Sequence, residues 1–119
     1  MDKPRTDTFL PLTPVAFEIL LALADGERHG YSILQEVESR SGGAVSLHAG
    51  TLYRALARLL ESGLIAELDA PPDPADDDER RRYYRLTAQG VAVARAEASR
   101  LEGQVAAARA RRLLKGARA

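Results

Sequence analysis

A chain of 119 residues is one ordinary domain, long enough for a modest hydrophobic core and short for an enzyme with a buried cleft. The sequence contains no cysteine, which excludes disulfide bonds and thiolate metal sites, and its two histidines lie too far apart in the expected helices to suggest a zinc site. No apolar run approaches the length of a membrane span and the formal net charge is zero, so we expect a soluble, cytoplasmic protein without membrane contact and without an excess of basic residues.

Two helices are expected in the first forty residues. The first lies in "LTPVAFEILLALADG", where Thr13 is a suitable N-cap, Pro14 occupies the first helical position and Gly26 can end the helix. The second lies in "HGYSILQEVESRSGG", in which one side is apolar and residues 41–43 supply a stop. His29 stands at the start of this helix, where a capping or turn role is the simplest interpretation.

The stretch "GTLYRALARLLESGLI" predicts a third helix that begins near His48 or Ala49 and ends at Gly63. Its leucines recur at spacings that gather them on one side of the helix. The opposite side carries Thr51, Arg54 and Arg58. A solvated surface helix can show the same pattern, so the neighbouring elements have to decide what this small cationic face does.

A two-stranded wing is expected next. "LIAEL" and "RRYYRL" read as strands from their alternation and tyrosines, and the proline- and aspartate-rich residues 69–80 between them predict a long hairpin tip. Charge is segregated here, because residues 69–79 hold six acidic side chains and no basic one, whereas residues 80–119 hold eleven basic and two acidic ones. Local charged patches therefore matter more than the net charge of zero.

Thr87 is the expected cap of a last helix, which is predicted to run from about Ala88 to near Leu114. Small and apolar residues recur along it at alternating steps of three and four, as in a heptad seam. The residues of this seam are Val91, Ala94, Ala98, Leu101, Val105 and Ala108. A single helix with so narrow a seam cannot bury it against a small core, so we expect a second copy of the chain to cover it in a homodimer.

These elements predict a mainly α fold with a small two-stranded β-wing, namely a winged helix-turn-helix followed by a C-terminal dimerisation helix. Residues 1–86 would form the DNA-binding domain, with residues 1–9 as a flexible arm, and residues 87–119 would form the dimerisation helix and a basic tail. In helix-turn-helix proteins the second helix of the motif enters the major groove. We expect the third helix to have that role here, and its small cationic face suits a groove lined by phosphates.

The same residues resemble the PadR-like family of transcriptional regulators. The resemblance runs in order through "LTPVAFEILLAL", "HGYSILQEV", "GTLYRALARLLESGLI" and "RRYYRLTAQG", and covers most of residues 10–95. Each piece is weak alone, but four in register are specific. The resemblance implies a homodimeric repressor that binds double-stranded operator DNA of two-fold symmetry with its third helix and its wing.

The resemblance also implies which residues lie at the DNA. In the "GTLYR" piece these are Gly50, Thr51, Tyr53 and Arg54. In the wing strand they are Arg80, Arg81 and Arg82, which would approach the backbone or the minor groove. His48, at the start of the reading helix, and Arg58, on its exposed face, are expected there from the pattern itself. Tyr53 could instead pack its ring, and the arginine run could instead form ion pairs with the acidic tip.

Two features depart from the family's pattern. The wing tip is long and acidic where a typical member has a short, basic one, which places negative charge near the phosphates. One terminal helix replaces the longer C-terminal domain of the larger members. Members of the family often release DNA when a small molecule binds near the dimer interface, and this departure puts wide pockets of that kind in doubt.

Two other functions compete with operator binding. One is a small-molecule-sensing or drug-binding protein with its pocket at the dimer interface, although an alanine-rich seam lets helices approach closely and leaves little space. The other is a winged-helix module that binds a basic protein through Asp73 and residues 76–79. Neither histidine has a serine and a carboxylate at catalytic spacing, so we expect no enzyme, no metal and no cofactor.

Overall fold

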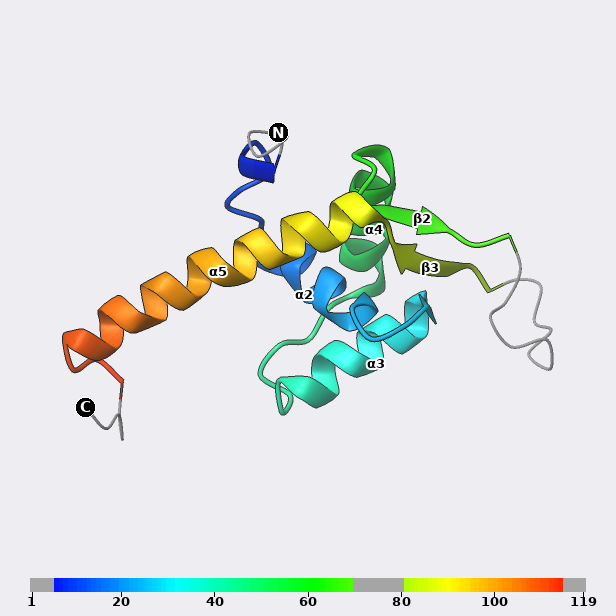
Figure 1. Ribbon diagram of the computed structural model, residues 1–119. Coiled ribbons are helices and arrows are strands. Elements are labelled where there is room, and N and C mark those ends of the chain that lie inside the picture. The colour runs from blue at the N-terminus through cyan, green and yellow to red at the C-terminus, as the bar shows by residue number, and fades with distance from the viewer. Residues whose placement is uncertain (1–5, 70–80, 115–119) are drawn as a thin grey trace.

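The computed structural model describes residues 6–69 and 81–114. The elements follow in the order α2 (Pro14–Leu23), β1 (Arg28–His29), α3 (Gly30–Arg40), α4 (Ala49–Glu61), β2 (Ile65–Glu67), β3 (Tyr83–Leu86) and α5 (Ala88–Ala110). Figure 1 shows α2, α3 and α4 gathered into a body, with β2 and β3 extending from one end and α5 projecting far beyond the other. None of the helices in these two ranges is long and apolar enough to cross a membrane.

The core lies where the three body helices meet. Each helix contributes one apolar stripe, and five leucine and isoleucine side chains of these stripes are at most 1% exposed. They are Ile19 and Leu20 of α2, Ile33 of α3, and Leu52 and Leu56 of α4. Burying a side chain of this size stabilises the fold by about 1.5–3 kcal/mol relative to leaving it in water, so these stripes fix the relative positions of the helices.

Local signals predicted most helix ends correctly. The Thr13 hydroxyl oxygen accepts the Ala16 N–H at 3.1 Å and caps α2. Gly63 ends α4 with a φ of 79°, a conformation that glycine adopts without strain. The Gly63 N–H donates to the Leu60 carbonyl and the Leu64 N–H donates to the Leu59 carbonyl, which is the Schellman pattern of hydrogen bonds.

The two strands predicted for the wing are present as β2 and β3, and a third strand that the sequence analysis did not predict joins them, so the order of the sheet is β1-β3-β2. β1 pairs antiparallel with β3, with Arg28 opposite Tyr84, and β2 pairs with the other edge of β3. β1 has only two residues, which is too short for an alternating pattern in the sequence. It becomes a strand only because the turn before α3 meets the free edge of β3.

Helix α5 begins on the body and then leaves it. Gly90 lies so close to the Leu64 carbonyl that a side chain at this position would overlap it. Gly90, Val93 and Glu97 are buried on one side of the helix. The helix ends at Ala110, four residues before the predicted end, because Arg112 adopts a φ of 62° and the Leu113 N–H returns to the Ala108 carbonyl.

Candidate nucleic-acid interface

Helix α4 presents a cationic face on the side opposite to its buried leucines. Leu52, Leu56 and Leu59 are buried, whereas Arg54 and Arg58 are exposed. In the part of the chain that the structure describes, neither arginine forms an ion pair. Two guanidinium groups one turn apart are therefore available to an anionic partner.

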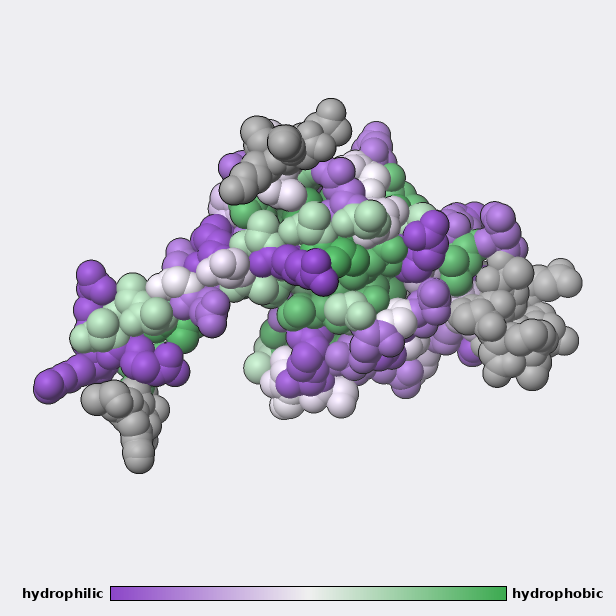
Figure 2. Space-filling view, in the orientation of Figure 1, coloured by the Kyte–Doolittle hydropathy of each residue, from purple (hydrophilic) through white to green (hydrophobic). Residues whose placement is uncertain are grey.

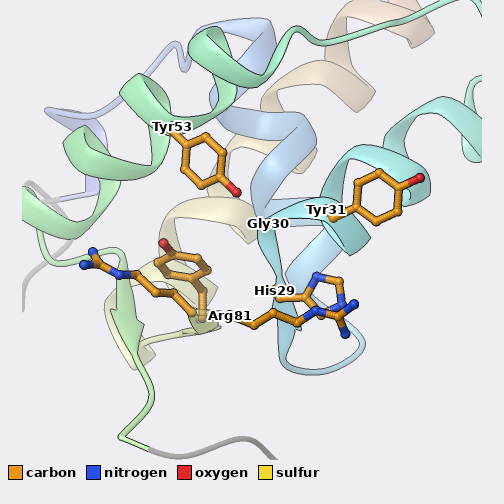
Figure 3. A pocket seen from close by; sticks show the side chains of 7 residues that line it. His29, Gly30, Tyr31, Tyr53 and Arg81 are labelled. Carbon is orange, nitrogen blue, oxygen red and sulfur yellow. The ribbon is translucent and has the colours of Figure 1, made fainter. Parts of the chain in front are cut away.

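A cleft of about 350 Å³ lies between the N-terminus of α3, the middle of α4 and the base of the wing. Its lining residues are His29, Gly30, Tyr31, Tyr53, Arg81, Arg82 and Tyr84. Figure 3 shows the Tyr53 hydroxyl directed toward Gly30, Arg81 beside His29, and the Tyr31 hydroxyl directed away from Tyr53. We call this space the wing cleft.

The first turn of α3 is held in place at the edge of the wing cleft. The Arg28 Nε–H donates to the Ala22 carbonyl at 2.7 Å, and its Nη1–H donates to the Ser32 hydroxyl at 3.0 Å. His29 is the N-cap, and its Nδ1 accepts the Ser32 N–H at 3.2 Å, as its predicted capping role requires. The ring of His29 also meets Tyr83 edge-on, with the ring centroids 5.3 Å apart. The positive end of the α3 dipole is thereby fixed toward the cleft.

The absence of a side chain at Gly30 leaves room for Tyr53. A Cβ atom at Gly30 would lie 2.5 Å from the Tyr53 Oη and 3.0 Å from its Cζ. The ring of Tyr53 therefore contacts α3 at Gly30. The side chain is 52% exposed, so the rest of it is in water. Both interpretations of Tyr53 thus have a physical basis: the ring packs, and the hydroxyl lies at the rim of a cationic cleft.

Arginines and tyrosines set the electrostatics of the wing cleft. Burial raises the pKa of the Tyr84 phenol, and the nearby Glu67 raises it further, while Arg82 opposes the shift. Tyr84 is therefore a neutral hydroxyl at physiological pH. Arg82 pairs with Glu67 at 3.8 Å, but their side chains are 72% and 40% exposed, so this ion pair contributes little. With Arg81 exposed beside it, the cleft favours an anion.

The other predicted residues of α4 lie on the far side of this helix from the wing cleft. Thr51, Arg54 and Arg58 line a groove of about 420 Å³ between α4, the first turn of α2 and the segment before it. We call this space the arginine groove. The structure thus divides the predicted residues into two groups, one on each flank of α4.

The remaining predicted DNA-binding residues are placed as follows. Gly50 is exposed in the first turn of α4, where an added Cβ would meet Arg54 Nη1 at an ordinary 3.5 Å. His48 is the exposed N-cap of α4 and makes no capping side-chain hydrogen bond there. Arg80 and the acidic tip from residue 70 onward lie outside the described residues. Residues 6–9, expected in a flexible arm, form a helical turn from which Phe9 packs against the core.

The predicted seam of α5 lies about 100° around the helix from the side that packs on the body. Val91, Ala94 and Ala98 of this seam each follow directly after one of the buried residues Gly90, Val93 and Glu97, and all six seam residues are half-buried or exposed. Figure 2 shows apolar side chains where α5 crosses the body and a second group near its far end. In that second region Val105 is 44% exposed and Leu113 is 72% exposed.

Glu97 was missed by the sequence analysis. Its side chain is 2% exposed, and Arg100 pairs with both of its oxygens, at 2.7 Å and 2.8 Å. The hydrogen bonds from Arg100, with a further one from the Leu12 backbone, hold the pKa of Glu97 below its ordinary value against the effect of burial. This carboxylate therefore fastens α5 to the segment that precedes α2.

Four residues of the wing cleft were also missed, namely His29, Gly30, Tyr31 and Tyr84. The "HGY" sequence did indicate the start of a helix. It gave no sign that this start would face the wing, because that contact depends on β1 pairing with β3.

Comparison with known proteins agrees with this architecture. A structure of a transcriptional regulator from Clostridium thermocellum superposes with a TM-score of 0.67 at 23% identity, covering 90% of this chain and 93% of that one. A PadR family transcription regulator from Clostridium difficile gives a TM-score of 0.67 at 21% identity, covering 82% and 96%. The structure of RosR from H. salinarum superposes with a TM-score of 0.60 at 28% identity, covering 82% of this chain and 78% of that one.

Sequence relatives match over shorter stretches. Protein X of Lysinibacillus sphaericus, itself uncharacterised, is 32% identical over 74 residues, which are 62% of this chain and 65% of that protein. A 37.1 kDa protein in transposon TN4556 of Streptomyces fradiae is 39% identical over 90 residues, which are 73% of this chain and 24% of that protein. This chain therefore spans less than two thirds of the length of either relative.

The family model of the PadR-like transcriptional regulators matches residues 19–96. This range contains α3, α4, strands β2 and β3, and the first nine residues of α5. The proteins of this family are regulators of transcription and not enzymes. The fold, the matched range and the order of the elements agree, and the chain belongs to the PadR-like family of transcriptional regulators.

Proposed function

We propose that the protein is a homodimeric, sequence-specific DNA-binding repressor that reads operator half-sites in the major groove with α4. The observation that carries this proposal is the exposed cationic face of α4, where Arg54 and Arg58 have no carboxylate partner in the described chain. An operator-binding protein of this kind would act in the cytoplasm.

Base readout would come from the exposed side of α4. The leucines on the other side anchor the helix in the core, so this face can enter the groove without loss of packing. Arginine donates two hydrogen bonds to the O6 and N7 of guanine, which is the commonest specific contact in the major groove. Arg54, near the N-terminal end of α4, would read bases, while His48 and Gly50 lie close enough to the same end to approach a phosphate.

A backbone phosphate would bind in the wing cleft. The cleft combines the positive end of the α3 dipole, the Tyr53 hydroxyl and the arginines Arg81 and Arg82. Contacts of this type carry no sequence information, but they fix the register of the reading helix on the duplex. The wing cleft and the face of α4 would thus divide positioning and recognition between them.

The seam of α5 would join two copies. A two-fold axis through paired α5 helices would present two copies of α4 to half-sites that are about one helical turn, or ~34 Å, apart. Ala94, Ala98 and Ala108 would allow the helices to approach closely, with Leu101 and Val105 as the larger contacts.

The test is a fluorescence anisotropy titration of the full chain against labelled DNA from upstream of its own gene. It is run at two salt concentrations, with a scrambled duplex of equal length as the control. We expect binding that prefers the upstream DNA and weakens with salt, as release of counterions requires. Equal, weak binding to both duplexes would contradict the proposal.

A further inference from the structure

The arginine groove has a chemical character different from that of the wing cleft. Its walls are mostly apolar and come from Phe9 and Leu12 before α2, Val15 in the first turn of α2, and Ala55 and Leu59 of α4. Its volume of about 420 Å³ lies within the range of roughly 300–1,000 Å³ that small-molecule sites occupy. Apolar walls gain free energy by burying hydrocarbon, which a phosphate does not offer.

Positive charge is concentrated along the same groove. Arg54 and Arg58 line it and are free of ion pairs within the described residues. The N-terminus of α2 also opens into it through Thr13 and Val15, and the first turn of this helix contains no acidic residue. A helix N-terminus favours an anion, so α2 adds to the attraction of the two guanidinium groups.

We infer that the arginine groove binds a small amphiphilic carboxylate, with its apolar body against Phe9, Val15 and Leu59 and its acid group on Arg54 and Arg58. The apolar walls select a hydrocarbon body and the guanidinium groups select a negative charge, so a ligand needs both parts to bind well. Arg54 and Arg58 cannot hold this ligand and DNA at the same time. Competition with DNA rests on the proposed function, whereas binding of the carboxylate does not.

The direct test uses the full chain without DNA. Octanoate is titrated by isothermal calorimetry, and octanol serves as the neutral molecule of matched length. We expect saturable octanoate binding and about tenfold weaker octanol binding, because a charge-assisted hydrogen bond is lost with the carboxylate. No saturable octanoate binding, or equal affinity for octanol, would overturn the inference.

Three variants locate the site. Arg54→Gln and Arg58→Gln should each weaken octanoate binding by about tenfold. Arg95→Gln is the matched control, because Arg95 is exposed on α5 and has no ion pair in the described chain. An Arg95→Gln variant that loses octanoate as the other two do would place the binding elsewhere and overturn the assignment.

The Ala55→Leu variant distinguishes binding of the carboxylate from binding of DNA. Ala55 lines the groove and is half-buried, so a leucine there fills the space in which the apolar body would lie, while Arg54 and Arg58 stay in place. Melting of this variant checks that it folds. We expect it to bind DNA normally and to lose octanoate, and unchanged octanoate binding by a folded variant would overturn the inference.

Competition is measured on the complex with DNA. Octanoate should release labelled DNA from the wild type and leave the Ala55→Leu complex bound. Octanoate that binds the free protein without releasing DNA would refute the competition while the site itself stands. A protein that binds octanoate but no DNA would refute the proposed function instead.

Discussion

The Tyr53 hydroxyl of α4 occupies the space in which a side chain at Gly30 of α3 would begin, with only 2.5 Å between a Cβ at position 30 and the Tyr53 Oη. Gly30 is buried and Tyr53 is half-exposed, so the tyrosine is the side chain that can move. The close approach of these two residues ties the position of Tyr53, a predicted DNA contact, to the absence of a side chain at Gly30.

Gly30→Ala should displace Tyr53 from the wing cleft and weaken operator binding by about tenfold, the loss of one charge-assisted contact to phosphate. The fold should change by less than about 1 kcal/mol, because alanine is favourable in a helix. Anisotropy and urea unfolding measure the two effects. Gly103→Ala is the control: its site is open space, so it should add about 0.5–1 kcal/mol of stability and leave DNA binding unchanged. Normal DNA binding by Gly30→Ala would refute the phosphate contact of Tyr53.

Arg54→Ala should reduce affinity for the operator and not for a scrambled duplex. Loss of a bidentate contact to guanine costs about 1–3 kcal/mol of discrimination. Arg95→Ala, on an exposed side of α5, should leave both affinities unchanged. Competition titrations with the two duplexes measure the difference, and a parallel loss on both would reassign Arg54 to the phosphate backbone.

Arg81→Gln should change how strongly the affinity for DNA depends on salt concentration. Removal of one phosphate contact lowers the slope of log affinity against log salt concentration by about 1 and weakens binding to all sequences alike. A series of titrations at increasing salt measures the slope. An unchanged slope would mean that Arg81 faces away from DNA in the complex.

The ion pair of Glu97 with Arg100 should make stability depend on pH. Hydrogen bonds hold the pKa of Glu97 below its ordinary value of 4.5, so the pair stabilises the fold above that pH and loses its contribution as the pH falls through the lower, folded-state pKa. Glu97→Gln should lower the free energy of unfolding by about 1–3 kcal/mol at neutral pH. It should also make stability less dependent on pH in the acid range. Urea unfolding across the acid range measures both effects. Glu102→Gln, on an exposed stretch of α5, should change neither.

Val105→Asp should weaken the proposed dimer. A charge at Val105, near the C-terminal end of the α5 seam, would lose its hydration in the interface, and no residue of the seam carries an opposite charge to compensate. Sedimentation equilibrium at several protein concentrations measures the dissociation constant. Ala106→Asp places the same residue one position away, outside the seam, and controls for the loss of helix propensity. Equal dissociation of the two variants would argue against this seam.

Local patterns in the sequence were sufficient for most of the fold. Thr13, Gly63 and Thr87 mark helix ends through hydrogen bonds to residues three or four positions away, and such contacts can be predicted from sequence. The leucines of α4 fixed its buried side, and with it the exposed side that carries Arg54 and Arg58. The order of the elements and the resemblance then pointed to the family that the comparisons show.

Contacts between distant segments were decided only by the tertiary structure. The two residues of β1 become a strand because they meet the edge of β3 more than fifty residues later. Glu97 is a charged residue that composition would place in water, and it is buried because Arg100 and the Leu12 backbone satisfy its oxygens. Likewise the wing cleft and the arginine groove exist only once α4 lies between α3 on one flank and α2 on the other. Periodicity tells which side of a helix is buried, but the neighbours of its exposed side depend on how all the buried sides pack together.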